Sequence, residues 1–250
     1  MALLKQFKTP FGIIRISRSK DGTLSYYQSG CFHSQSTPRG ISVCAYVHVM
    51  QQIILQTRVQ LKAPKRVLII GCGGGTLATM LMRRGCKVTV VDINPVAFTI
   101  ARDYFYMPAE VMCVAENGLT YIRTTRQRFD AVVVDVFDSM NNVPTGFRAK
   151  KFFAAAKAVL SSGGVFIMNV ITKNDADKCA KRISTNAAIA DMDISIYDWP
   201  GHKDRNTLIV GGSLNGIAVP DGSEPSYVKA DMKGLVCKQV VMPKKCRSIR

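Results

Sequence analysis

The fold of this chain is decided by one stretch, Val67-Leu68-Ile69-Ile70-Gly71-Cys72-Gly73-Gly74-Gly75-Thr76. Four consecutive apolar residues, three of them β-branched, are typical of a strand that is buried on both faces. The glycine run ends that strand and leads into a helix that begins at Thr76. Because glycine has no side chain, a ligand can lie directly against the main chain at a helix N-terminus. The stretch therefore predicts a nucleotide-type site in which Gly71, Gly73 and Gly74 contact the ligand.

A second buried strand with an acid at its end strengthens this prediction. Residues 87–91 are mostly apolar and are followed by Asp92, about 20 residues after Gly71. At that distance, the carboxylate that ends the second strand can bind both hydroxyls of a ribose. A dinucleotide fold would place a third glycine at position 76, where a threonine stands. The pattern therefore fits a nucleoside of the S-adenosylmethionine type better than a dinucleotide.

The composition is that of a globular chain of 250 residues, with 47% apolar and 20% charged residues. No apolar run approaches the length of a membrane span, and the first residues lack the apolar core of a signal peptide. We therefore expect a cytoplasmic protein without membrane contact. The eight cysteines form no Cys-x-x-Cys pair and have no neighbouring histidine cluster, so we expect buried, reduced thiols and no metal site.

The formal net charge of +17 favours anionic partners. The basic residues are nevertheless spread along the chain instead of forming a stripe with interleaved aromatic residues. The exception is a short group near the C-terminus, formed by Lys244, Lys245, Arg247 and Arg250. A small-molecule partner is therefore favoured over nucleic acid.

The rest of the chain alternates between strands and helices. Strands are predicted at 67–70, 87–91, 111–115, 131–135, 165–170, 194–197 and 207–210, and helices at 42–61, 76–84, 95–106, 148–160 and 174–190. This spacing predicts an α/β fold, a doubly wound and mostly parallel seven-stranded Rossmann-like sheet. Residues 1–41 precede it as a small β-hairpin or meander domain, residues 42–211 form the nucleoside-binding domain, and residues 212–250 form a basic C-terminal extension.

Polar side chains follow the carboxyl ends of several predicted strands, where ligands of such sheets bind. Asn117, after the third strand, can donate to and accept from an adenine, and it is equally suited to cap the helix that begins at Gly118. Asp135 ends the fourth strand, where partial desolvation would let it accept a proton from an attacking amine. Asp138 lies three residues on and could hold the same amine as a cation. The alternative for both acids is that they cap the segment that follows.

In combination these motifs resemble a known family. The matching segments are Gly71–Thr76, Val91–Pro95, Glu116–Gly118 and Asp135–Asp138, together with Gln35-Ser36 and Tyr46-x-x-x-Met50. They look like the nucleoside-binding and active-site motifs of spermidine synthases, the polyamine aminopropyltransferases, and of spermidine-synthase-like proteins, over about residues 10–211. The resemblance implies a Rossmann-like fold of the class I methyltransferase type, an N-terminal β-domain and a homodimer.

The resemblance also implies roles for individual residues. Asp92 would bind the ribose, Asn117 the adenine, and Asp135 would act as the catalytic base. Gln35 and Tyr46 would line the pocket, with Tyr46 on the side of the substrate. The co-substrate would be decarboxylated S-adenosylmethionine, the acceptor a small-molecule amine, and no metal would be required.

The chain departs from the family pattern at three places. Gly74 stands where the family has an acid that holds the free amine of the decarboxylated nucleoside, and residues 36–41 lack the acidic pair usual there. Asp92 replaces the usual glutamate. Losing the loop acid removes the partner of an ammonium group, but it also removes repulsion against a carboxylate. Intact S-adenosylmethionine therefore remains an alternative co-substrate.

Three hypotheses about function follow. The first is an aminopropyltransferase that acts on an amine, with Asp135 as the base. The second is a methyltransferase that uses the same nucleoside site and acts on a small molecule or, with less support, on RNA. The third is a nucleoside-binding protein without catalytic activity.

Overall fold

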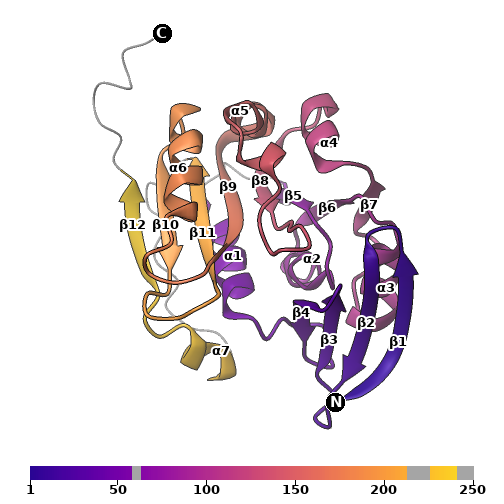
Figure 1. The fold of residues 1–250 in the computed structure, drawn as a ribbon. Coiled ribbons are helices and arrows are strands. Elements are labelled where there is room, and N and C mark those ends of the chain that lie inside the picture. The colour runs from indigo at the N-terminus through magenta and orange to yellow at the C-terminus, as the bar shows by residue number, and fades with distance from the viewer. Residues whose placement is uncertain (58–62, 213–225, 241–250) are drawn as a thin grey trace.

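The computed structural model describes residues 1–57, 63–212 and 226–240. It has two sheets: a four-stranded antiparallel sheet near the N-terminus and an eight-stranded main sheet with helices on both faces (Figure 1). The predicted α/β class, a mostly parallel, doubly wound sheet preceded by a small β-region, is confirmed. Within the described residues, no helix is both long and apolar enough to cross a membrane.

The N-terminal sheet is a simple meander. It consists of β1 (Ala2–Thr9), β2 (Gly12–Arg18), β3 (Leu24–Gln28) and β4 (Cys31–Ser36), which pair in sequence order. The predicted turn lies between β2 and β3, where the carboxylate of Asp21 accepts a hydrogen bond from the backbone N–H of Thr23 (3.1 Å). One face of this sheet packs its apolar side chains against Ile100 and Phe105 of a helix that flanks the main sheet. The two sheets are thereby held side by side.

The main sheet and its helices take up the rest of the described chain. In order they are α1 (Ala45–Gln56), β5 (Arg66–Ile70), α2 (Thr76–Met82), β6 (Lys87–Asp92), α3 (Val96–Phe105), β7 (Met112–Ala115), α4 (Gly118–Thr124), β8 (Phe129–Val134), the short 3-10 helix η1 (Thr145–Arg148), α5 (Lys150–Val159), β9 (Leu160–Thr172), α6 (Cys179–Ile189), β10 (Ile194–Asp198), β11 (Arg205–Gly212), α7 (Ser226–Asp231) and β12 (Val236–Val240).

The strand order explains where a ligand can bind. The order across the sheet is β12-β10-β11-β9-β8-β5-β6-β7. The five strands from β9 to β7 in this order are parallel to one another, whereas β11, β10 and β12 each pair antiparallel with their neighbours. From β5 the chain first moves outward to β6 and β7, and then returns to the other side at β8. In open sheets of this kind, ligands bind in the crevice beyond the carboxyl ends of the strands, where the direction reverses.

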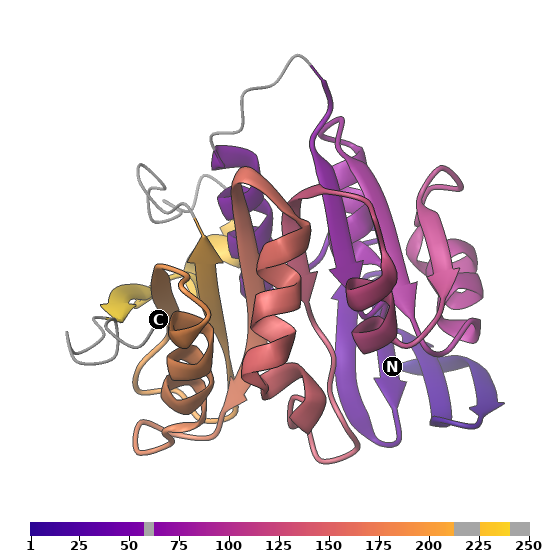
Figure 2. The same ribbon diagram turned by 90° about the horizontal axis from the view of Figure 1, so that it is seen from above.

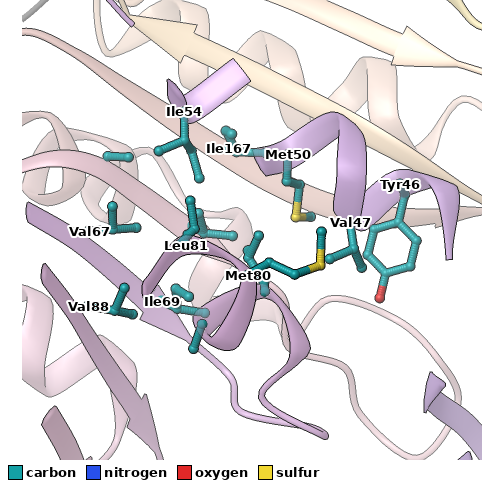
Figure 3. Close-up of a cluster of buried hydrophobic side chains, with 14 of the residues drawn as sticks. Tyr46, Val47, Met50, Ile54, Val67, Ile69, Met80, Leu81, Val88 and Ile167 are labelled. Carbon is teal, nitrogen blue, oxygen red and sulfur yellow. The ribbon is translucent and has the colours of Figure 1, made fainter. Parts of the chain in front are cut away.

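The central strand is buried on both faces, as its sequence predicts. Val67 and Ile69 face a cluster with α1 and α2, in which Met50, Ile54 and Leu81 pack over the strand (Figure 3). The alternate residues of the strand face a second cluster with α4, α5 and α6 on the opposite side (Figures 1 and 2). Side chains of a strand point alternately to its two faces, so an unbroken apolar run serves both layers.

The C-terminal segment corrects one prediction. The sequence predicts a basic C-terminal extension at residues 212–250 and a sheet of seven strands. Instead, β12 pairs antiparallel with β10 and becomes the eighth strand. Its sequence, VCKQV, is only partly buried, as is usual for an edge strand, so the apolar alternation is too weak to reveal it. The basic group from Lys244 to Arg250 lies outside the described residues.

Candidate active site

A large cavity opens at the predicted crevice. It has a volume of about 1040 Å³ and is lined by the glycine loop, by Asp92, Asn117, Asp135 and Asp138, and by residues of the N-terminal sheet. The structure therefore brings together the motifs at the ends of four different strands. One half of the cavity surrounds the glycine loop and the ends of β6 and β7, and the other half surrounds Asp135.

The first glycine of the loop is required by the close approach of two strands. Gly71 has φ 99°, and a Cβ atom there would lie only 2.2 Å from the carbonyl oxygen of Asp135. The backbone N–H of Gly71 donates to the carbonyl oxygen of Val91 (2.8 Å), and that of Asp135 donates to the carbonyl oxygen of Ile70 (2.9 Å). The chain can leave β5 at this angle only without a side chain.

Gly74 lies against the N-terminal sheet. Its backbone N–H donates to the hydroxyl oxygen of Ser34 (3.0 Å), and a Cβ atom would lie 3.0 Å from both the Cβ atom of Ser34 and the ring of Phe105. The space beside this loop position is thus already filled by β4 and α3. This packing gives a physical reason why the loop has a glycine where the spermidine synthase pattern has an acid.

The Asp92 carboxylate ties the glycine loop to the end of β6. One of its oxygens accepts from the backbone N–H of Cys72 (2.7 Å) and the other from that of Asn94 (2.8 Å). Burial raises the pKa of Asp92, and these two hydrogen bonds act in the opposite direction. A carboxylate oxygen can accept more than one hydrogen bond, so Asp92 remains able to accept from ribose hydroxyls in the cavity.

Asn117 caps a helix, as the alternative interpretation of its position predicts. Its side-chain oxygen accepts from the backbone N–H of Leu119 (2.8 Å) at the start of α4. The residue also lines the cavity, so its amide nitrogen remains available to donate to a base. The two predicted roles are therefore compatible, and the capping role is the one seen in the structure.

Asp135 is held by two side chains from different elements. One carboxylate oxygen accepts from Nδ2 of Asn169 on β9 (2.9 Å), and the other accepts from the hydroxyl of Tyr46 on α1 (3.5 Å). Burial raises the pKa of Asp135, and both hydrogen bonds partly offset this effect. Burial and the neighbouring Asp135 charge also raise the pKa of Tyr46, which therefore stays a neutral donor. This arrangement fixes the direction of a carboxylate at the edge of the cavity.

Asn169 was missed by the sequence analysis. It is 1% exposed, and its Nδ2 also donates to the side-chain oxygen of Asn206 (2.9 Å), which lines the cavity. The side-chain oxygen of Asn169 is buried without a hydrogen-bond partner. The available signal was a lone asparagine inside the apolar run of residues 165–171, because a polar residue there requires partners.

Asp138 lies on the wall of the cavity but is exposed. One of its oxygens accepts from the backbone N–H groups of Met140 (2.9 Å) and Asn142 (3.0 Å) and so stabilises the turn that follows β8. This is the capping role that the sequence analysis left open. Its second oxygen faces no described donor at hydrogen-bond distance, and a role in holding an amine stays a prediction.

Two predicted site residues, Gly74 and Gln35, do not line the cavity. The side chain of Gln35 donates to the hydroxyl of Ser25 (3.0 Å), the residue opposite it in the β3–β4 pair. Neighbouring residues on a strand face opposite sides, so Ser34 takes the position toward the glycine loop. His33 also lines the cavity, and burial lowers its pKa. The sequence analysis had treated neither residue as part of the site.

The N-terminal sheet and the loop after β8 both line the cavity and contact each other. The Sγ of Cys31, near the β3–β4 turn, lies 3.9 Å from the carbonyl oxygen of Ser139. Phe11 and Phe32 on one side and Met140 on the other line the cavity and are exposed. Among the described residues, no three His, Cys, Asp or Glu side chains lie close enough together to hold a metal ion.

Comparisons with known proteins place this geometry in a family. The family model for the spermine/spermidine synthase domain matches residues 45–197, more than half of the chain. A polyamine aminopropyltransferase of Chromobacterium violaceum is 35% identical over 111 residues, which cover 42% of this chain and 42% of that protein. An eEF1A lysine and N-terminal methyltransferase homolog of Drosophila pseudoobscura is 28% identical over 156 residues, which cover 56% of this chain and 23% of that protein.

The crystal structure of a probable spermidine synthase from Corynebacterium glutamicum has the same fold. Its TM-score is 0.75 at 15% identity, and the match covers 96% of this chain and 90% of that one. The sequence matches, in contrast, span less than half the length of the curated relatives named above. The matched domain includes α1, the glycine loop and the ends of β6 and β8. On this basis the chain belongs to the spermine/spermidine synthase family.

Proposed function

We propose that the protein is a transferase that binds S-adenosylmethionine or its decarboxylated form and transfers an alkyl group, in the first instance aminopropyl, to an amine. The observation that carries this proposal is the placement of Asp135. Its carboxylate is fixed by Asn169 and Tyr46 in the same cavity as the glycine loop and Asp92. A nucleoside held by the loop would therefore have a positioned proton acceptor beside it.

The proposed reaction is a direct displacement. The neutral amine attacks the carbon attached to the sulfonium, the new C–N bond forms as the C–S bond breaks, and the electron pair leaves on sulfur as a thioether. The amine becomes cationic in this step, and its surplus proton passes to Asp135. Asp135 can accept this proton only in its ionised form. The protein thus makes two contributions, the positioning of the two reactants and the acceptance of the proton.

The names of the relatives support aminopropyl transfer. The Chromobacterium violaceum relative is a polyamine aminopropyltransferase, and the Corynebacterium glutamicum structure is of a probable spermidine synthase. For this chain we correspondingly propose decarboxylated S-adenosylmethionine as the co-substrate, a small-molecule amine as the acceptor, and a homodimer. The dimer is tested by light scattering on a size-exclusion column, where a monomeric mass would contradict it.

Methyl transfer is the second candidate, and a specific observation favours it. Ser34 and Phe105 occupy the space beside Gly74, where the family pattern has the acid for the aminopropyl ammonium. No carboxylate is then contributed from that position, which favours the intact co-substrate with its own carboxylate. The Drosophila pseudoobscura relative is a methyltransferase homolog by name.

Calorimetric titration of one protein preparation with both nucleosides separates these candidates. Tighter binding of the decarboxylated form supports aminopropyl transfer, and tighter binding of intact S-adenosylmethionine supports methyl transfer. Binding of either form with no product from any amine would leave a nucleoside-binding protein without activity. Failure to bind either form would contradict the proposed function.

A further inference from the structure

Seven basic side chains gather at one end of the cavity, beyond β8 and β9. They lie in η1, in the first turns of α5 and α6, and in the loop between β9 and α6. We call them the basic rim: Arg148, Lys150, Lys151, Lys173, Lys178, Lys181 and Arg182. All except Arg148 are exposed, and Arg148, Lys173 and Arg182 line the cavity. The rim therefore begins inside the cavity and continues onto the surface.

These residues are far apart in sequence but close in space. The side chain of Asn186 on α6 donates to the carbonyl oxygen of Arg148 (2.9 Å), just before α5 begins. Arg182 lies one helical turn before Asn186 and on the same face of α6. The start of α5 consequently lies beside the second half of α6, and the two helices pack against each other.

The rim has no ion-pair partner within the described parts of the chain. Ion pairs there join Lys157 to Asp191 and Arg205 to Asp175 and Asp198. The nearby Asp177 accepts from the backbone N–H groups of Lys173 (3.1 Å) and Cys179 (2.8 Å) and so begins α6. Exposed Asp204 and Asp138 also line the cavity. These carboxylates are fewer than the cations around them, so the rim keeps a net positive charge.

The position of the cations is unfavourable for the helices themselves. The N-terminus of a helix carries partial positive charge and favours acidic residues. Yet α5 begins with Lys150 and Lys151, the first turn of α6 contains Lys181 and Arg182, and neither first turn contains an acid. The Nε of Arg148 is moreover buried without a hydrogen-bond acceptor, although its Nη2 donates to Thr145 (2.9 Å). A bound anion would offset the clustered charge.

We propose that the basic rim binds phosphate groups of the acceptor, so that the reacting amine belongs to a phosphate-bearing molecule. This inference rests on the proposed function, because it names the acceptor of the same cavity. A free polyamine is a polycation, and seven cations at this end of the cavity would repel it. Phosphate groups on the rim would instead hold their own molecule with its amine directed toward Asp135.

Two probes test the proposal on the full chain. The first is a fluorescently labelled single-stranded oligoribonucleotide followed by anisotropy, and the second is pyrophosphate as a competitor. The test variant combines Lys151→Glu, Lys181→Glu and Arg182→Glu, and these changes place acids where the two helices favour them, so folding is preserved. The control variant combines Lys5→Glu, Arg18→Glu and Lys20→Glu, exposed cations of the N-terminal sheet with the same total charge change.

We expect the rim variant to bind the probes at least about tenfold more weakly. The slope of log Kd against log salt concentration should also be shallower by about 2, because each lost phosphate contact reduces this slope by roughly 0.7. The control should stay within about twofold of the wild type. An equal loss in both variants would show a general charge effect and overturn the proposal, as would a wild type that binds neither probe at low salt.

The same preparations distinguish this inference from the proposed function. Nucleoside affinity is measured on each variant, and the rim variant should retain it. Phosphate binding at the rim without nucleoside binding would contradict the proposed function alone. Efficient competition by pyrophosphate would indicate a small phosphorylated acceptor, and binding of the oligoribonucleotide without such competition would indicate a nucleic acid.

Discussion

The two halves of the cavity are built in different ways. The half around the glycine loop is made of main chain and of short local motifs, in which Gly71, Asp92 and Asn117 each lie at or just after the end of a strand of the parallel sheet. The half around Asp135 is made of side chains that come from α1, β8 and β9. Local motifs can be recognised in a sequence, whereas the arrangement of side chains that are distant in sequence depends on tertiary packing. The same difference predicts how each half should respond to mutation.

Asp135→Asn should have the largest effect. We expect turnover to fall by about 10²- to 10⁴-fold, because the proton acceptor is removed, while the nucleoside affinity changes little. Single-turnover kinetics and calorimetry measure the two quantities separately. The matched control is Asp138→Asn, an exposed acid on the same cavity wall. Turnover of Asp135→Asn at the wild-type rate would overturn the role of Asp135, and an equal loss in both variants would assign Asp138 a comparable role.

Asp92→Ala should affect the other half. Hydrogen bonds to charged groups contribute about 1.5–3 kcal/mol, so we expect the nucleoside to bind roughly 10- to 100-fold more weakly. The loop N–H of Cys72 also loses its acceptor. Asp103→Ala removes an exposed acid from α3 and serves as the control for charge. If Asp92→Ala weakened only turnover, the division of the cavity into two halves would be wrong.

Asn169→Ala should misplace the Asp135 carboxylate without removing it. We expect roughly a tenfold loss in kcat, with a smaller change in nucleoside affinity. The pH profile gives a more specific readout. Burial raises the pKa of Asp135 above 3.8, and the hydrogen bond from Asn169 lowers it, so losing that bond should raise the pKa further. The acidic limb of kcat/KM should move to higher pH, and Asn169→Gln should restore part of it. An unshifted limb would indicate a purely structural role.

Gly74→Ala should have the smallest effect on activity and a measurable one on stability. The new Cβ atom would meet Ser34 and Phe105 at 3.0 Å, and overpacking of this kind costs about 1–3 kcal/mol. Denaturant unfolding measures the change. Combining Gly74→Ala with Phe105→Leu relieves the contact. The double variant should therefore lose less free energy of unfolding than the two single variants lose together. Simple additivity would show that β4 and α3 do not restrict this loop position.

The sequence was sufficient for the fold class and for the convergence of the glycine loop, Asp92 and Asn117 on one cavity. The runs at 67–70 and 131–134 are wholly apolar and 87–91 is mostly apolar, and the glycine loop and Asp92 follow at the spacing of a nucleotide-binding motif. Gln35 lies outside the cavity lining, which the sequence alone does not reveal, because the direction of a side chain on a short strand depends on register, and a shift of one residue exchanges the two faces. Ser34 took the predicted position instead.

Asn169 and the basic rim could not be read from the sequence for a different reason. Asn169 can donate to Asp135 only because β9 lies beside β8. The seven rim residues come together only when α5 and α6 pack against each other. The cations that appear dispersed along the chain are therefore partly gathered in space. Charge patterning along a sequence does not report this kind of convergence.

The eighth strand also has a consequence for biosynthesis. β12 is the last described strand in chain order, and it pairs with β10. In the sequence, β11 and α7 lie between these two strands. Until residues 236–240 have been translated, one edge of β10 exposes unpaired backbone N–H and C=O groups, a template for pairing with other chains. Lys238 and Gln239 on β12 are exposed and protect the final edge. A chain truncated before β12 would thus be prone to aggregate through this edge.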